Sequence, residues 1–309
     1  MNEKVQSFET HRFTFVAAQL FIGWIMTLWA LNVWAFNVYI LRKNPHGNFS
    51  GALGLFEFSS GCRAVREGST SWKALKLIYN WYGDFGFKPA ISRDPFAWFW
   101  LKNVNGQAVR NRLKIIVREL MNAIAQVSQK NNEVRILSIA SGSAQSIFLA
   151  IKGLRDNGFT GKISLCLLDL DREALEYSKK LAEIYNISSS DISFIVAPVS
   201  HIKKELRGQR FDIIEMAGLL DYLTDRQAFK LMKRIYSMLA PGGYFVTCHI
   251  HPNFEMYFMR WVCCWQMIYR TISHFSKIIR EAAAWNSRII TEPHYIHSVA
   301  VCKKDIKEN

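Results

Sequence analysis

Residues 13–41 contain no Asp, Glu, Lys or Arg, although the chain as a whole is rich in basic residues. A helix of about 20 mostly apolar residues spans the hydrocarbon core of a bilayer, so this segment is predicted to be a transmembrane helix. Arg12 precedes the segment, and Arg42 and Lys43 follow it at the expected position of the membrane interface. Basic residues are more frequent after the segment than before it, which predicts a cytoplasmic location for the rest of the chain.

Two other interpretations of residues 13–41 stay open. A cleaved signal peptide has a shorter apolar core and a cleavage site of small residues, which makes this segment a poor candidate. A hydrophobic helix packed on the rest of the chain or on a partner is favoured by Trp24, Trp29 and Trp34, which lie in the middle of the segment. Tryptophans of membrane-spanning helices concentrate instead at the two interfaces.

The chain also lacks metal-site and disulfide spacing. Its six cysteines include no C-x-x-C pair and do not follow the pattern of a secreted disulfide framework, so a reducing cytosolic environment is expected. The pairs His249-x-His251 and His294-x-x-His297 have no carboxylates or thiolates at ligand spacing beside them. No metal is therefore expected.

Acidic residues are few: 25 Asp and Glu stand against 39 Lys and Arg, which gives a formal net charge of +14 at pH 7. Such a charge attracts anionic lipid headgroups or nucleic acid at long range and does not distinguish between them. The content of 50% hydrophobic and 14% aromatic residues is high for a soluble protein and favours a lipid bilayer as the partner. No nucleic acid partner is expected, and the oligomeric state is left open.

From residue 105 onward the pattern alternates between strands and helices, although the dinucleotide motif G-x-G-x-x-G is absent. A lead-in helix precedes a strand at 134–139, a turn of small residues at 140–143 and a helix that ends near Leu154. Small residues at such a turn let backbone N–H groups and the helix N-terminus approach a ligand. The later strands are predicted at 163–168, 192–196, 211–216, 244–249, 288–291 and 296–302. The fold class is therefore α/β, with a doubly wound, mostly parallel sheet of seven strands.

Asp169 ends the second strand, about 27 residues beyond Gly142. In doubly wound folds a carboxylate at this position accepts hydrogen bonds from ribose hydroxyls. Asp171 is better explained as the N-cap of the helix that follows. The strand end and the small-residue turn together predict a nucleotide cofactor.

Four segments carry a resemblance to a known family: 137–143 (LSIASGS), 167–175 (LLDLDREAL), 211–223 (FDIIEMAGLLDYL) and 239–245 (LAPGGYF). In this order they resemble the class I S-adenosylmethionine-dependent methyltransferases. The segments 218–223 and 251–253, with 261–270 (WVCCWQMIYR), resemble a narrower bacterial group of putative methyl ester synthases for hydroxypalmitic acid signals. The resemblance covers about 200 residues and implies a Rossmann-like methyltransferase domain over 105–309.

The resemblance implies S-adenosylmethionine as the cofactor, and Glu215 is expected near its polar end. The candidate cofactor-binding residues are Ser138, Ala140, Ser141, Gly142, Ser143, Asp169, Leu170, Val199, Glu215 and Ala217. Three positions depart from the family pattern. Ser138 stands in place of an acidic residue, Ala140 in place of the first motif glycine, and Pro198 in place of a carboxylate after the third strand.

Methyl transfer from a sulfonium is a one-step displacement, which requires alignment of donor and acceptor and exclusion of water rather than many catalytic side chains. The candidate catalytic residues are Asp221, Tyr222, His249, Tyr269 and Arg270, with His251 considered beside them. The first three would serve as a general base for a hydroxyl or amine acceptor. Tyr269 and Arg270 would bind an anionic acceptor head. Loop stabilisation, packing and an ordinary salt bridge are the structural alternatives.

The expected organisation is an N-terminal tail at 1–12, the transmembrane helix at 13–41, an aromatic and basic connector at 42–104 and the catalytic domain at 105–309. The connector either lies at the membrane interface, through an amphipathic helix over 72–81, or caps the catalytic core. A lid helix is predicted over 254–272. The expected function is methylation of a lipid-like acceptor, with a fatty acyl carboxylate as the leading candidate. Methylation of RNA or protein, and a degenerate cofactor fold that scaffolds a membrane complex, are the alternatives.

Overall fold

The computed structural model describes residues 7–10, 13–42, 59–80 and 95–306. The chain divides into two compact units. Unit 1 comprises Met1–Ser7, Arg112–His251 and Ile268–Asn309, and unit 2 comprises Phe8–Asn111 and Pro252–Met267. Helix α6 (Val104–Ser128) contributes residues to both units. The units are described separately.

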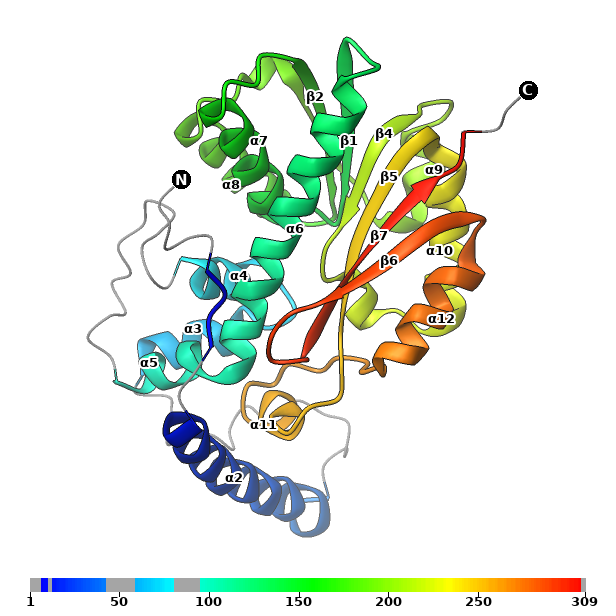
Figure 1. Cartoon of the computed structure of the whole chain (residues 1–309). Coiled ribbons are helices and arrows are strands. Elements are labelled where there is room, and N and C mark those ends of the chain that lie inside the picture. Colours follow the sequence, from blue (N-terminus) through cyan, green and yellow to red (C-terminus); the bar gives the residue numbers. More distant parts are fainter. Residues whose placement is uncertain (1–6, 11–12, 43–58, 81–94, 307–309) are drawn as a thin grey trace. The chain divides into compact units, whose positions relative to one another are not determined.

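Unit 1 is built on a seven-stranded mixed sheet with the strand order β3-β2-β1-β4-β5-β7-β6. In Figure 1, β1, β4, β5, β7 and β6 can be followed in this order across the sheet. The first five strands are parallel to their neighbours, and β7 runs antiparallel to both β5 and β6. The strands are β1 (Glu133–Ile139), β2 (Lys162–Asp169), β3 (Ile192–Val196), β4 (Phe211–Met216), β5 (Leu239–Ile250), β6 (Trp285–Thr291) and β7 (His297–Lys304). All seven predicted strands are confirmed, and the fold is the Rossmann-like one expected.

Helices follow the strands in the order the sequence predicts. They are α7 (Gln145–Asp156), α8 (Arg172–Ile184), α9 (Ile202–Glu205), α10 (Asp225–Met238) and α12 (Ile272–Ala282), with the short helices η3 (Ser189–Asp191), η4 (Val199–His201) and η5 (Leu219–Tyr222) between them. Asp171 caps α8 by accepting the Glu173 N–H at 2.9 Å, which confirms its predicted role. Thr224 and Gln227 form a capping box at the start of α10.

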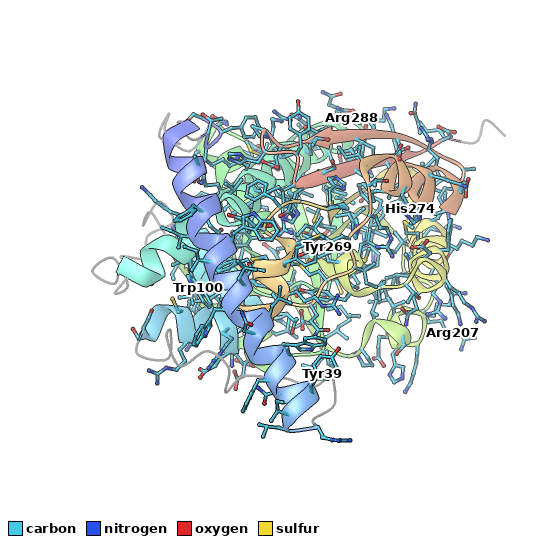
Figure 2. All side chains as sticks on the ribbon, turned by 90° about the horizontal axis from the view of Figure 1, so that it is seen from below. Tyr39, Trp100, Arg207, Tyr269, His274 and Arg288 are labelled. Atoms are coloured by element: carbon cyan, nitrogen blue, oxygen red, sulfur yellow. The ribbon has the colours of Figure 1, made fainter. Side chains whose placement is uncertain are left out.

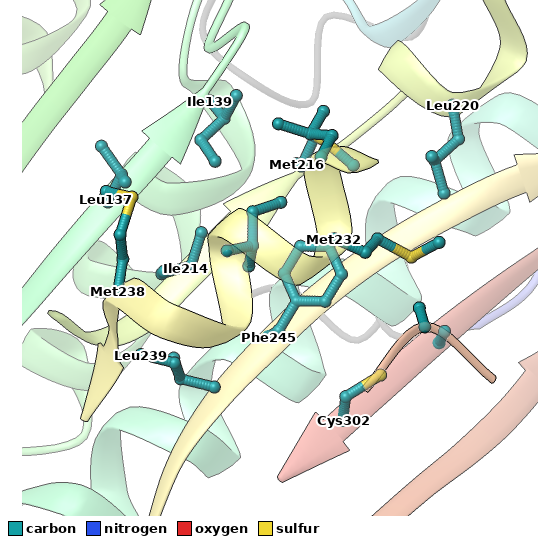
Figure 3. Packing of buried hydrophobic residues seen from close by; sticks show 14 of the residues in the cluster. Leu137, Ile139, Ile214, Met216, Leu220, Met232, Met238, Leu239, Phe245 and Cys302 are labelled. Atoms are coloured by element: carbon teal, nitrogen blue, oxygen red, sulfur yellow. The ribbon is translucent and has the colours of Figure 1, made fainter. Parts of the chain in front are cut away.

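One face of the sheet packs against α10 and α12. Figure 3 shows this cluster, in which Leu137 and Ile214 from the sheet meet Met232 and Met238 from α10. Phe245 of β5 stacks on Trp285 with ring centroids 5.4 Å apart. Alternate residues along β1 and β4 point to the opposite face of the sheet, because side chains alternate along a strand. That second face carries Ser138 on β1 and Glu215 on β4, which are register partners.

The Pro-Gly-Gly segment at 241–243 is the start of the long β5 rather than a turn before it. Gly242 has a φ of +74°, and the register between β4 and β5 shifts between Phe211 and Ile213. A Cβ on Gly243 would lie 2.6 Å from the carbonyl oxygen of Asp212. The two glycines therefore permit a bulge where the strands come too close for a side chain.

In its described residues, unit 2 consists of helices and the segments that join them. The helices are α2 (Phe13–Ala35), a π-helical turn η1 (Phe36–Ile40), α3 (Ser60–Glu67), α4 (Trp72–Tyr79), α5 (Pro95–Lys102) and α11 (Met256–Trp261). In the part of the chain that the structure describes, no helix has both the length and the apolarity to cross a membrane. The transmembrane helix predicted for residues 13–41 is therefore not supported, and α2 followed by η1 occupies that segment. A helix predicted over 72–81 is present as α4 in its described part, with Ala74, Ile78 and Tyr79 buried, and residue 81 lies outside the described residues.

The lid helix predicted over 254–272 is wrong in its extent, since only α11 and the first residue of α12 are helical within this range. Cys264 has a φ of +53°, which an α-helix cannot accommodate. In unit 1, the backbone N–H of Ile268 donates to the Asp221 carbonyl at 2.7 Å and that of Arg270 to the Ile250 carbonyl at 3.3 Å. Hydrogen bonds to η5 and to the end of β5 replace helical bonds in this segment.

Candidate active site

The loop after β1 has an unusual backbone in which every second residue is left-handed. The φ angles are +52° at Ala140, +53° at Gly142 and +51° at Ala144. The Ser141 N–H donates to the Leu168 carbonyl at 3.1 Å, and the Ala144 N–H to the Ser141 carbonyl at 2.7 Å. The loop is thus folded tightly against the end of β2 before α7 begins.

Asp169 joins this loop to β2. One carboxylate oxygen accepts the Gly142 N–H at 2.7 Å and the other accepts the Asp171 N–H at 2.8 Å. Partial burial raises the pKa of Asp169, and the two backbone donors oppose that rise. Because a carboxylate has about four acceptor positions, these two bonds leave capacity for a ligand hydroxyl. The predicted pairing of Gly142 with Asp169 at one sheet edge is present in the structure.

A buried carboxylate lies beside the position where the resembled family has an acidic residue. Ser138 on β1 is the register partner of Glu215 on β4, and its hydroxyl donates to Glu215 at 2.6 Å. Ser146 of α7 donates to the second oxygen of Glu215 at 3.3 Å. Burial raises the pKa of Glu215 to about 7, although Ser138, Ser146 and the positive charge of Arg112 oppose that rise. β4 therefore supplies the carboxylate that β1 lacks.

The remaining predicted cofactor residues lie around the same strand ends. Ser143 is buried in the loop, Leu170 is 70% exposed just beyond Asp169, and Val199 begins η4 after β3. The backbone of Ala217 hydrogen-bonds to Glu215. The hydroxyl of Ser141 is buried without a hydrogen-bond partner among the described residues. An unpaired buried hydroxyl in a loop with left-handed turns fits a polar ligand at this edge.

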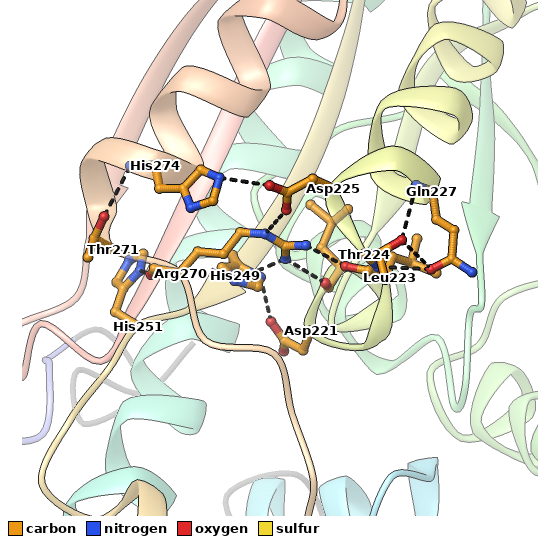
Figure 4. Close-up of polar contacts among 11 residues, drawn as sticks. Asp221, Leu223, Thr224, Asp225, Gln227, His249, His251, Arg270, Thr271 and His274 are labelled. Atoms are coloured by element: carbon orange, nitrogen blue, oxygen red, sulfur yellow. Dashed lines mark hydrogen bonds and ion pairs between the residues drawn. The ribbon is translucent and has the colours of Figure 1, made fainter.

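Three of the predicted catalytic residues form a second, internal cluster, drawn in Figure 4. Asp221 lies 2.9 Å from Nδ1 of His249, without the angles of a hydrogen bond, and accepts the Ile250 N–H at 3.0 Å. Arg112 of α6 lies 4.0 Å from the other oxygen of Asp221. All of these side chains are buried. Asp221 thus neutralises a basic cluster beneath the end of β5.

Arg270 is held on every side of its guanidinium group. Nε donates to Asp225 at 2.8 Å, Nη1 donates to the Leu220 carbonyl at 3.1 Å and lies 3.3 Å from Nε2 of His249, and Nη2 donates to the Leu223 carbonyl. The side chain is buried. Arg270 thus links η5 to the segment before α12 through contacts within the protein. Tyr222 on η5 and Tyr269, the residue before Arg270, are both partly buried.

Sequence reasoning considered His297 only as a metal ligand and missed its position. It begins β7, pairs in register with Ile250 and is buried, and neither ring nitrogen has a hydrogen-bond partner among the described residues. Burial lowers its pKa well below the usual value, and the charges of Arg112, His251 and His249 act in the same direction. His251 bonds to the Arg270 carbonyl at 2.8 Å and to the Ser298 hydroxyl at 2.7 Å. Only the strand pairing brings these histidines together.

Comparison with known proteins defines the class. Residues 130–301 match the family model described as a methyltransferase domain, which covers more than half of the chain. The chain therefore belongs to this family. It is an S-adenosylmethionine-dependent methyltransferase with S-adenosylmethionine as its cofactor. No curated protein sequence matches it.

Two solved structures share the fold over most of the chain. A possible exported protein from Bordetella parapertussis is 15% identical, with 94% of this chain and 97% of that chain covered and a TM-score of 0.64. A magnesium protoporphyrin IX methyltransferase from Synechocystis PCC 6803, with bound S-adenosylhomocysteine, is 9% identical. It covers 80% of this chain and 100% of its own, with a TM-score of 0.52. At these identities the comparison shows the fold alone.

Proposed function

We propose that this methyltransferase transfers the methyl group of S-adenosylmethionine to the carboxylate of a lipid-like acceptor. The observation that carries the proposal concerns Asp221, the predicted general base. It is committed to contacts within the protein, where it accepts the Ile250 N–H and lies 4.0 Å from Arg112. A hydroxyl or amine acceptor needs a general base, whereas a carboxylate is already a nucleophile. Because the predicted general base is bonded within the protein, the site suits an acceptor that needs no general base.

The residues that would hold the cofactor follow from the sheet edge. Asp169 retains acceptor capacity for ribose hydroxyls, and the exposed Leu170 beside it is available to cover the adenine ring. Glu215 and Ser138 would bind the ammonium group of the methionine part. Ser141 offers its unpartnered hydroxyl, and the turn at Gly142 allows close approach. When bound, the cofactor supplies a sulfonium methyl group that is open to in-line attack.

Two features of the sequence support a lipid-like acceptor. The chain has 14% aromatic residues, and its segment 261–270 resembles the methyl ester synthase group for hydroxypalmitic acid. A long-chain hydroxy acid combines the carboxylate with an apolar chain. It is the acceptor class that we expect.

The test uses the full-length protein with isotopically labelled S-adenosylmethionine and two acceptors of equal chain length, a 3-hydroxy fatty acid and the corresponding diol. We expect label in a base-labile methyl ester of the acid and none in the diol. Asp169→Asn should abolish transfer, and the exposed exchange Lys277→Gln on α12 is the control. Binding of S-adenosylhomocysteine without transfer to either acceptor or to a membrane lipid extract would overturn the proposal.

A scaffold without turnover is the second candidate, and one observation favours it. Ala140 holds a left-handed conformation at the position of a family glycine, which strains the cofactor loop. Calorimetric titration with S-adenosylhomocysteine separates the two candidates. Absence of binding at high micromolar ligand favours the scaffold, and binding favours the enzyme.

A further inference from the structure

The N-terminal helices expose an unusual number of large apolar side chains. We call this set the α2–η1 surface: Phe21, Ile22, Trp24, Ile25, Leu28, Trp29, Phe36, Tyr39, Ile40 and Leu41, which are between 40% and 70% exposed. In Figure 2, α2 runs across the view, and Tyr39 is labelled toward its C-terminal end. Soluble monomers rarely expose contiguous apolar patches of this kind without a partner for them.

The exposed residues of α2 lie on one side of the helix. At about 100° per residue, the six from Phe21 to Trp29 fall within an arc of about 160°. Thr27 falls on the opposite side and is buried, and α2 packs against α11 in the same unit. Unit 2 thus covers the side of the helix that carries Thr27, and the opposite side carries the exposed apolar side chains. A helix that is apolar all round is normally buried on all sides.

Two polar side chains of α2 that the structure describes bond to the helix backbone. The Thr27 hydroxyl donates to the Gly23 carbonyl at 2.7 Å, and the Asn32 amide donates to the Leu28 carbonyl at 2.8 Å. Each of these donors is paired within the helix, one turn back. Entry into a less polar medium therefore leaves these two hydrogen bonds intact.

Charge and residue type favour a lipid bilayer over a protein as the occupant. Unit 2 has twelve Lys and Arg against six Asp and Glu, and the α2–η1 surface contains none of the four. Arg42 follows the surface directly and is exposed. Trp and Tyr are enriched at membrane interfaces, and basic residues beside them are attracted to anionic headgroups.

We propose that the α2–η1 surface docks the protein on an anionic lipid bilayer, with α2 and η1 lying in the plane of the interface. The apolar side chains enter the boundary between headgroups and acyl chains, and Arg42 lies at the headgroup level. This inference goes beyond the proposed methyl transfer and does not depend on it. It places the protein where lipid-like acceptors reside.

The test is co-sedimentation of the full-length protein with vesicles of phosphatidylcholine and phosphatidylglycerol at a ratio of three to one. The double variant Ile25→Glu/Leu28→Glu should bind at least about tenfold more weakly, because two apolar side chains no longer gain from burial in lipid. Ile184→Glu is the matched control, since Ile184 on α8 in unit 1 is 52% exposed, as is Ile25. The control should bind as the wild type does, and binding should weaken on vesicles of phosphatidylcholine alone.

Two results would overturn the proposal. One is unchanged vesicle binding by the double variant. The other is a wild-type protein that is dimeric in solution and a double variant that is monomeric, because a second copy of the chain would then cover the surface. If the double variant does not fold, Phe21→Ser and Trp24→Ser test the same surface more mildly. Unchanged binding of S-adenosylhomocysteine in these variants keeps a failure here distinct from a failure of the proposed methyl transfer.

Discussion

Two helices, α10 in unit 1 and α2 in unit 2, differ in how far the protein buries their apolar side chains. α10 buries Ala228, Met232 and Ile235 against the sheet, and its N-terminus is closed by a capping box. α2 is apolar on its exposed side as well as on its covered side. Packing within the protein covers most of the apolar side chains of α10, whereas large apolar side chains of α2 stay exposed. The core of unit 1 therefore explains the apolar face of α10, and the exposed side of α2 is what the proposed lipid surface would cover.

The largest effect expected from this difference comes from matched truncations. Phe245→Ala removes a fully buried ring from the core of unit 1 and should lower the free energy of unfolding by about 3–5 kcal/mol. Leu28→Ala removes a side chain that is 54% exposed and should change it by less than about 0.5 kcal/mol in the absence of lipid. Denaturant unfolding checks both values. A large loss from Leu28→Ala would mean that protein already covers the α2–η1 surface.

The internal cluster of unit 1 should show a smaller but clear effect. Asp221→Ala leaves the Ile250 N–H unpaired and the charge of Arg112 uncompensated, so we expect a loss of about 3 kcal/mol. Asp156→Ala is the control, because its carboxylate is 40% exposed and pairs with Lys152, which is also exposed. It should cost about 1 kcal/mol or less. Equal losses in thermal unfolding would show that Asp221 does not hold the buried cluster together.

The cofactor site shows which contacts could be predicted from the sequence and which could not. Asp169 was predicted because it ends an apolar strand at a fixed distance from Gly142, and both signals are local. The pairing of Ser138 with Glu215 was not predicted, since it depends on the register between β1 and β4, 77 residues apart. From sequence spacing alone, Ser138 was interpreted as the replacement of an acidic residue of the family pattern. The register shows that the carboxylate is provided from the neighbouring strand.

The internal contacts of Arg270 and the true extent of the helix after Phe254 could not be predicted from the sequence, for a related reason. The apolar run over 254–272 has helical spacing, but the backbone of Ile268 bonds to Asp221, which is distant in sequence. Such tertiary bonds override local propensity and leave no periodic signal. His297 is hidden in the same way, because its neighbours come from β5 and α6.

The pH dependence of cofactor binding should reveal Glu215. Its carboxyl group has a pKa raised to about 7, so it is largely protonated below that pH and ionised above it. An ionised carboxylate binds an ammonium group better, and the affinity for S-adenosylhomocysteine should therefore rise as the pH increases from about 6 to 8. Glu215→Gln should weaken binding and remove the dependence. Calorimetry at three pH values checks this, and an unchanged pH profile in the variant would assign the titration to another group.

The same group makes a prediction for stability with a defined sign. The folded-state pKa of Glu215 lies above the unfolded value of about 4.5, so the folded state holds more protons between the two values. The contribution of Glu215 to stability should therefore fall as the pH rises from about 4.5 to 7, by up to about 3 kcal/mol. Glu215→Gln should be less sensitive to pH over this range in denaturant unfolding. A wild-type protein whose pH sensitivity equals that of the variant would contradict the raised pKa.

The smallest effect concerns the loop after β1, which contains left-handed residues and belongs to the candidate cofactor site. Ala140→Gly relieves a left-handed conformation and should stabilise unit 1 by up to about 1 kcal/mol. Ala144 is equally left-handed, but its methyl group is buried, so Ala144→Gly should gain less because it also loses apolar contact. Thermal unfolding of the two variants side by side checks the order. If Ala140→Gly also tightens the binding of S-adenosylhomocysteine, the strain opposes cofactor binding. Tighter folding with weaker binding would instead show that the loop is held strained to keep its N–H groups aimed at the ligand.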